Sequence, residues 1–167
     1  MATPTYTLID SVTLTTNTAN VTFTNLPTDG TYGDLVIVLT GTMAVGTVGH
    51  ADIKFNLSTS NYNVIHMDGD GSSTISRGYA NQGSMRFAEN NSFSTTTLNT
   101  TIIQVFDYAE AKQKSVLIRT SRADGLVAAT AGVWADTSAI NRFILGGDAA
   151  YEAGTTVFVY GIASEVS

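Results

Sequence analysis

Two histidines and two closely spaced aspartates are the residues of this sequence whose types best suit chemistry. His50 and His66 are the only side chains with an unperturbed pKa near neutrality, which would suit proton transfer or metal binding. Neither has a carboxylate or a second histidine at ligand spacing along the sequence. A surface or packing role is therefore expected for both histidines.

Asp68 and Asp70 are each followed by glycine, and loops rich in carboxylate oxygens can bind calcium. An EF-hand loop beginning at Asp68 would have Ser73 where glycine is required and Tyr79 where the bidentate glutamate belongs. The two aspartates are thus weak metal candidates, and a tight turn is the favoured interpretation.

Other catalytic chemistry finds little support. The chain has no cysteine, which excludes disulfides, thiolate-bound zinc and a cysteine nucleophile. It has no Gly-x-Ser-x-Gly elbow, and its glycine-rich segments lack the lysine that ends a phosphate loop. A Ser-His-Asp triad assembled by the fold stays open, but no residue points to one. We expect no catalytic residue, no cofactor and no enzymatic activity.

Charge and hydropathy restrict the partners. The net charge is −6, and the eight basic residues are scattered, with Arg119 and Arg122 the nearest approach to a patch. Nucleic-acid binding is not expected, because it requires clustered basic residues. No apolar run reaches the length of a membrane span, and the first residues lack the features of a secretory signal. We therefore expect no membrane partner and synthesis in a host cytoplasm.

Alternation of apolar and polar residues runs through the chain, with turn residues every eight to twelve positions. This pattern is typical of a sandwich or barrel. Strands are expected at 6–8, 12–14, 21–23, 34–41, 51–57, 62–67, 97–108, 115–120, 126–134, 140–145 and 155–162. The range 34–41 contains a continuous apolar run, as in a strand covered on both faces. Residues 107–113 could form one helical turn.

The polar stretch 74–97 predicts short strands at 75–79 and 84–88 within long loops. The sequence as a whole predicts one domain over residues 1–167, an all-β, antiparallel, jelly-roll-like sandwich of roughly nine or ten strands. Trp134, at the end of an apolar run, is expected in the core or an interface, with a sugar-stacking platform as the alternative.

Five segments resemble a group of small β proteins of tailed bacteriophages, and they occur in the same order along the chain. They are 6–14 (YTLIDSVTL), 21–27 (VTFTNLP), 34–38 (DLVIV), 132–140 (GVWADTSAI) and 153–162 (AGTTVFVYGI). The group comprises capsid decoration (cement) proteins and related terminal domains of tail fibres. The resemblance implies a virion β-sandwich; residues 42–96 do not take part in it.

The leading hypothesis is a structural virion protein, a homotrimeric decoration protein bound to the major capsid protein on the outer surface of a phage head. No shaft, collagen-like repeat or coiled coil precedes the domain, which favours the head over the tail. Residues 1–5 could form a docking arm (Ala2, Thr3, Pro4, Thr5), because Pro4 favours extended backbone that can add to a neighbouring sheet.

Two other hypotheses stay open. The chain could be a tail-fibre or tail-tip receptor-binding module that recognises host surface carbohydrate through polar loops within 68–97, because loops often carry binding in β scaffolds. An enzyme such as a polysaccharide depolymerase would need a constellation of carboxylates that the sequence does not display.

Overall fold

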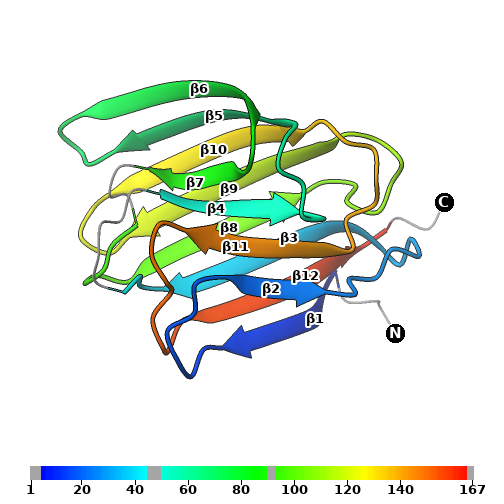
Figure 1. Cartoon of the computed structure of the whole chain (residues 1–167), viewed down its shortest axis with the longest axis horizontal. Coiled ribbons are helices and arrows are strands. Elements are labelled where there is room, and N and C mark those ends of the chain that lie inside the picture. Colours follow the sequence, from blue (N-terminus) through cyan, green and yellow to red (C-terminus); the bar gives the residue numbers. More distant parts are fainter. Residues whose placement is uncertain (1–4, 45–49, 90–92, 165–167) are drawn as a thin grey trace.

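The computed structural model describes residues 5–44, 50–89 and 93–164, which form two antiparallel β-sheets and no helix (Figure 1). Among these residues, accordingly, no helix is long and apolar enough to cross a membrane. The strands are β1 (Tyr6–Thr13), β2 (Val21–Thr24), β3 (Tyr32–Gly41), β4 (His50–Phe55), β5 (Tyr62–Gly69), β6 (Thr74–Gln82), β7 (Met85–Glu89), β8 (Asn99–Val105), β9 (Lys114–Arg122), β10 (Val127–Trp134), β11 (Arg142–Gly147) and β12 (Thr156–Ala163). The predicted all-β sandwich is confirmed.

The two sheets have the nested pairing of a jelly roll. The large sheet contains β1-β12-β3-β8 in that order, and the small sheet is β2-β11-β4-β7. The first strand therefore pairs with the last, the second pairs with the last but one, and β4 pairs with β7. Successive strands of these eight lie in different sheets except for β4 and β7, which are neighbours in the small sheet, as in two interlocked Greek keys. The predicted jelly-roll character is thus confirmed by the strand order.

Two hairpins are added to this eight-stranded frame. The strands β9, β10, β5 and β6 continue the large sheet beyond β8, giving it eight strands, and β6 forms its outer edge (Figure 1). The described chain therefore has twelve strands, more than the nine or ten expected.

The predicted helical turn at 107–113 is wrong. These residues form turns, in which the N–H of Glu110 donates to the carbonyl of Asp107 at 3.0 Å. The side chain of Lys114 is buried, and its Nζ donates to the carbonyl oxygens of Glu110 (2.7 Å) and Lys112. The lysine thus takes carbonyl groups that a helix would offer to its own backbone.

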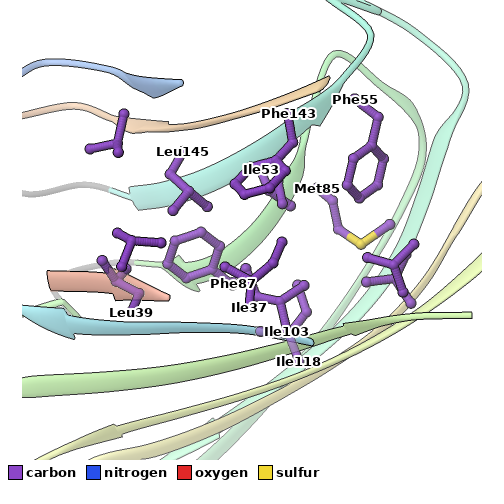
Figure 2. Packing of buried hydrophobic residues seen from close by; sticks show 14 of the residues in the cluster. Ile37, Leu39, Ile53, Phe55, Met85, Phe87, Ile103, Ile118, Phe143 and Leu145 are labelled. Atoms are coloured by element: carbon purple, nitrogen blue, oxygen red, sulfur yellow. The ribbon is translucent and has the colours of Figure 1, made fainter. Parts of the chain in front are cut away.

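The hydrophobic core lies between the two sheets and comes from every second residue of their strands. Ile37 of β3 and Ile103 of β8 face Phe87 of β7 and Ile53 of β4 across the gap between the sheets, as Figure 2 shows. All four are 0% exposed. Burial of one such side chain contributes about 1.5–3 kcal/mol relative to its exposed state, so this layer is the main source of stability.

Threonines of the large sheet donate hydrogen bonds to backbone carbonyl groups of β7, the edge strand of the small sheet. β7 lacks a neighbour on one side, so some of its carbonyl groups face β9 and β10 instead. The hydroxyl of Thr120 donates to the carbonyl of Phe87 at 3.1 Å, and that of Thr130 donates to the carbonyl of Arg86 at 3.3 Å. Both threonines are buried, and the bonds cover an edge that would otherwise be open to pairing.

The two faces of the large sheet should differ in their contribution to folding. Replacing the buried Ile37 with alanine should lower the free energy of unfolding by about 2–5 kcal/mol, because it leaves a cavity in the core. Replacing Ile65, which is 57% exposed, with alanine should cost less than about 1 kcal/mol. Urea unfolding followed by tryptophan fluorescence measures both; a cost for Ile65→Ala equal to that for Ile37→Ala would contradict this assignment of the faces.

Candidate functional site

Both histidines lie beside carboxylates. His50 begins β4, with its Nδ1 at 3.0 Å from Oδ1 of Asp148 and its Nε2 at 3.4 Å from Oδ2 of Asp52. His66 lies within β5, and its Nε2 is 3.5 Å from Oδ1 of Asp68. The carboxylates therefore lie close to both histidines in space, although no carboxylate was expected at ligand spacing along the sequence. In a strand, residues two apart share one face, so each His-x-Asp pair brings the two side chains together.

His66 also contacts a hydroxyl, which gives a Thr-His-Asp arrangement of the kind that activates nucleophiles. Its Nδ1 lies 2.8 Å from Oγ1 of Thr130, on the side of the ring opposite Asp68. His66 is 0% exposed and Thr130 is 2% exposed, so a substrate cannot contact either side chain. Only the Thr130 contact is a hydrogen bond, since Nε2 of His66 has no hydrogen-bond partner among the described residues. The arrangement is therefore a buried contact, which fits the packing role expected for His66.

The two aspartates proposed as metal candidates bind protein groups instead. Oδ1 of Asp70 accepts hydrogen bonds from the backbone N–H groups of Ser72 and Ser73, both at 2.9 Å, and these bonds lower the pKa of Asp70. Oδ1 of Asp68 accepts from Nη1 of Arg77 at 2.7 Å. Among the described residues, no group of three or more histidines and acids could hold a metal ion. Asp70 thus organises a tight turn, at which Gly71 has φ +87°.

A polar network fastens the added hairpin β5–β6 to β7. Arg77 of β6 bridges Asp68 of β5 and Glu89 of β7, with Nε at 3.7 Å from Oε2 of Glu89. The hydroxyl of Tyr79 donates to the same oxygen of Glu89 at 2.8 Å, and the guanidinium of Arg86 lies 5.8 Å from the centre of the Tyr79 ring. Charged hydrogen bonds therefore hold β6 where the aliphatic core ends.

The outer face of the large sheet, which points away from the small sheet, is unusually apolar. Ile65 and Met67 of β5, Leu117 of β9 and Val127 of β10 are 57%, 53%, 51% and 60% exposed. They are all on this face, because each alternates along its strand with a buried residue that points to the core. An exposed apolar surface of this extent is typical of a binding site for another molecule.

A shallow groove follows β10 along this face. Its floor is made by the small side chains of Ala129 and Ala131, and Ile65 and Leu117 stand on its two sides. The central part has a volume of about 450 Å³, and neighbouring hollows continue it in both directions along the strand. We call this feature the β10 groove. Its lining residues are Asn63, Val64, Ile65, Met67, Gly78, Tyr79, Ala80, Thr100, Ile102, Gln104, Ser115, Val116, Leu117, Ile118, Arg119, Thr120, Ser121, Val127, Ala128, Ala129, Thr130, Ala131, Gly132 and Val133.

The outer side of the small sheet is polar by contrast. Thr22 and Thr24 of β2 and Lys54 of β4 occupy the positions that alternate with its core residues. His50 and Asp52 lie on the same side of β4. One broad side of the sandwich is therefore suited to water, and the other is suited to contact with an apolar partner.

Trp134 is in the core, as expected, and the alternative of a sugar-stacking platform is wrong. It is 1% exposed, and its ring packs against Phe55 and Tyr62 at centroid distances of 5.7 and 6.3 Å. The region 68–97 also contains more strand than the expected long loops, since β6 and β7 cover residues 74–82 and 85–89. The two strands expected there, at 75–79 and 84–88, are confirmed.

Most of the predicted docking arm is outside the described residues. Ala2, Thr3 and Pro4 precede the first of them. Thr5 is exposed, and its carbonyl accepts a hydrogen bond from the N–H of Ala163 at 3.3 Å. The arm hypothesis therefore stays a prediction.

Fold and surface together define a jelly-roll β-sandwich with one apolar outer face. No protein-family model and no curated protein matches the sequence. Solved structures similar to the chain include a galectin of Caenorhabditis elegans, at 10% identity and a TM-score of 0.38 over 92% of this chain and 96% of the galectin. An exo-inulinase of Aspergillus awamori is similar at 15% identity and a TM-score of 0.44, over 94% of this chain and 29% of the enzyme.

A third similar structure comes from a phage. The CBM2 module of the evolved Dit protein of Lactobacillus casei BL23 phage J-1 matches 89% of this chain and 70% of that chain, at 10% identity and a TM-score of 0.30. All three TM-scores are below 0.5. No family model supports the narrower resemblance to decoration proteins.

Acid should destabilise the fold through His66. Burial lowers the pKa of His66 below its ordinary 6.5, so the unfolded chain binds a proton more readily than the folded chain. This contribution to stability is complete above pH 6.5 and is lost as the pH falls from 6.5 towards the lower pKa of the folded state. The urea midpoint should therefore fall between pH 7.5 and 5.5, and the fall should be smaller in His66→Gln. His50→Gln is the control, because it retains His66; an equal fall in the wild type and His66→Gln would refute the assignment.

Proposed function

We propose that this chain is a non-enzymatic structural protein of a bacteriophage virion, a capsid decoration protein bound to the outside of the head. The observation that carries the proposal is the apolar outer face of the large sheet, with exposed fractions above one half at Ile65, Met67, Leu117 and Val127. A decoration protein needs one surface that binds the shell and another that faces water. The two outer sides of this sandwich differ in the same sense.

The apolar outer face could also provide the binding free energy for attachment to a capsid. Aliphatic side chains release water when an apolar partner covers them, at about 25 cal/mol per Å² of apolar surface. The outer face offers this surface on rigid strands, so little conformational entropy is lost on binding. The net charge of −6 would keep coated particles soluble and mutually repelling.

The proposal includes assembly as a homotrimer on the major capsid protein. Three linked copies would turn three weak contacts into one durable attachment, because the second and third contacts form within one complex. Sedimentation of the purified chain should then give three times the chain mass of 17.6 kDa. A species with the mass of a single chain at micromolar concentration would exclude the trimer and leave attachment by separate copies.

The decisive test of the decoration proposal is to locate the protein on the phage particle. Antibody raised against the purified chain and labelled with gold should bind over the faces of phage heads in electron micrographs. Antibody against the major tail protein marks the tail in parallel and serves as the position control. Gold confined to the tail tip would favour receptor binding instead, and virions without gold would refute the phage assignment itself.

A further inference from the structure

The β10 groove carries a single charged side chain among apolar neighbours. Arg119 of β9 is exposed, and the cross-strand partners on either side of it are Ala129 of β10 and Ile102 of β8. No described residue forms an ion pair or hydrogen bond with its guanidinium. Arg122, three residues along, contrasts with it, because its Nε pairs with Oδ1 of Asp124.

No acidic residue lines the three hollows of the groove. An adjoining hollow beside Met67 and Val127 includes Asp68, but the carboxylate of Asp68 is already bonded to Arg77. An apolar partner that covered the groove would remove water from the guanidinium of Arg119. A buried charge without a partner is strongly unfavourable, so a stable complex requires an acceptor from the other molecule. A carboxylate is the best match, since it can accept two parallel hydrogen bonds from the arginine fork.

We propose that the β10 groove binds a segment of a protein partner that places aliphatic side chains on β5 and β10 and one carboxylate on Arg119. The inference rests on the proposed function, in which that partner belongs to the phage head. The groove follows β10 from Val127 to Val133, a length of roughly 20 Å at about 3.3 Å per residue. This length accommodates a short extended or helical segment.

The chemistry of the groove favours a protein over other ligands. A sugar would require several converging polar side chains and an aromatic platform, and the centre of the groove offers Arg119 and Gln104 between aliphatic residues. A nucleic acid would require more than one cation to neutralise its phosphates. Aliphatic contacts around one ion pair are instead typical of the centre of a protein interface.

The test uses phage heads prepared without this chain and the full-length purified protein, with binding measured by co-sedimentation. Arg119→Glu should weaken binding at least tenfold, because it places two carboxylates opposite each other. Arg119→Leu should also weaken binding, by several-fold, although it makes the groove more apolar. Lys54→Glu is the matched control on the small sheet, since it makes the same change of charge and should leave binding unchanged.

A second variant tests the shape of the groove. Ala131→Gln fills the floor with a longer side chain and should weaken binding. Ala153→Gln should have little effect, because Ala153 is an exposed residue of the turn before β12 and lies outside the groove. Circular dichroism and urea unfolding would show that each variant folds, as expected for exposed positions. Binding that persists in both Arg119→Glu and Ala131→Gln would overturn the inference.

The outcomes separate this inference from the proposed function. Wild-type protein that fails to bind heads would refute the decoration proposal itself. Wild-type binding that Arg119→Glu and Ala131→Gln leave intact would refute only the groove. Loss of self-association in Arg119→Glu, measured by sedimentation without heads, would make a second copy of this chain the occupant and would also overturn the inference.

Discussion

The strand β12 lies between β1 and β3 in the large sheet and pairs with each of them along nearly its whole length, with one register shift in each pairing. Its inward-facing residues, Val157 and Val159, are fully buried in the core. The N-terminal part of the sheet therefore cannot close until the C-terminal strand has been made and has paired. Contacts between such distant segments form slowly, because the loop that they close is long. The added hairpins and the β10 groove belong to the sheet that this closure completes.

Local sequence predicts the strands of this fold well where one side of the strand is buried. Val21 and Phe23 alternate with threonines, and β2 begins and ends within one residue of the expected range. The ends of β6 are harder to predict from the sequence. The strand is the edge of a sheet and none of its side chains is fully buried, so its composition resembles that of a loop. The order of the strands depends on pairing across the whole chain and cannot be read from any one segment.

The candidate site could be predicted only in part, for a related reason. In β5, apolar residues occupy both alternating series, with Val64 facing the core and Ile65 facing outward. This double pattern indicates that both faces of a strand are covered, but it does not distinguish cover by the same chain from cover by another molecule. The contact between His66 and Asp68 could be predicted from the sequence, because a strand places residues two apart on one face. The contact of His66 with Thr130 depends on the register of β5 and β10, which the sequence alone does not reveal.

The hairpin β5–β6 ends in the turn at Asp70 and Gly71, where the exposed residues are held mainly by hydrogen bonds to one carboxylate. Away from this turn, the hairpin is held to β7 by the ion pair between Arg77 and Glu89. The eight strands of the jelly-roll frame pair with one another without the hairpin. Tips of this kind tolerate inserted sequence, because an insertion disturbs a local turn and leaves the core intact. A foreign peptide inserted after Gly71 would therefore be carried clear of both sheets. On a repetitive particle surface, the same position would become a scaffold for displaying an antigen in many copies.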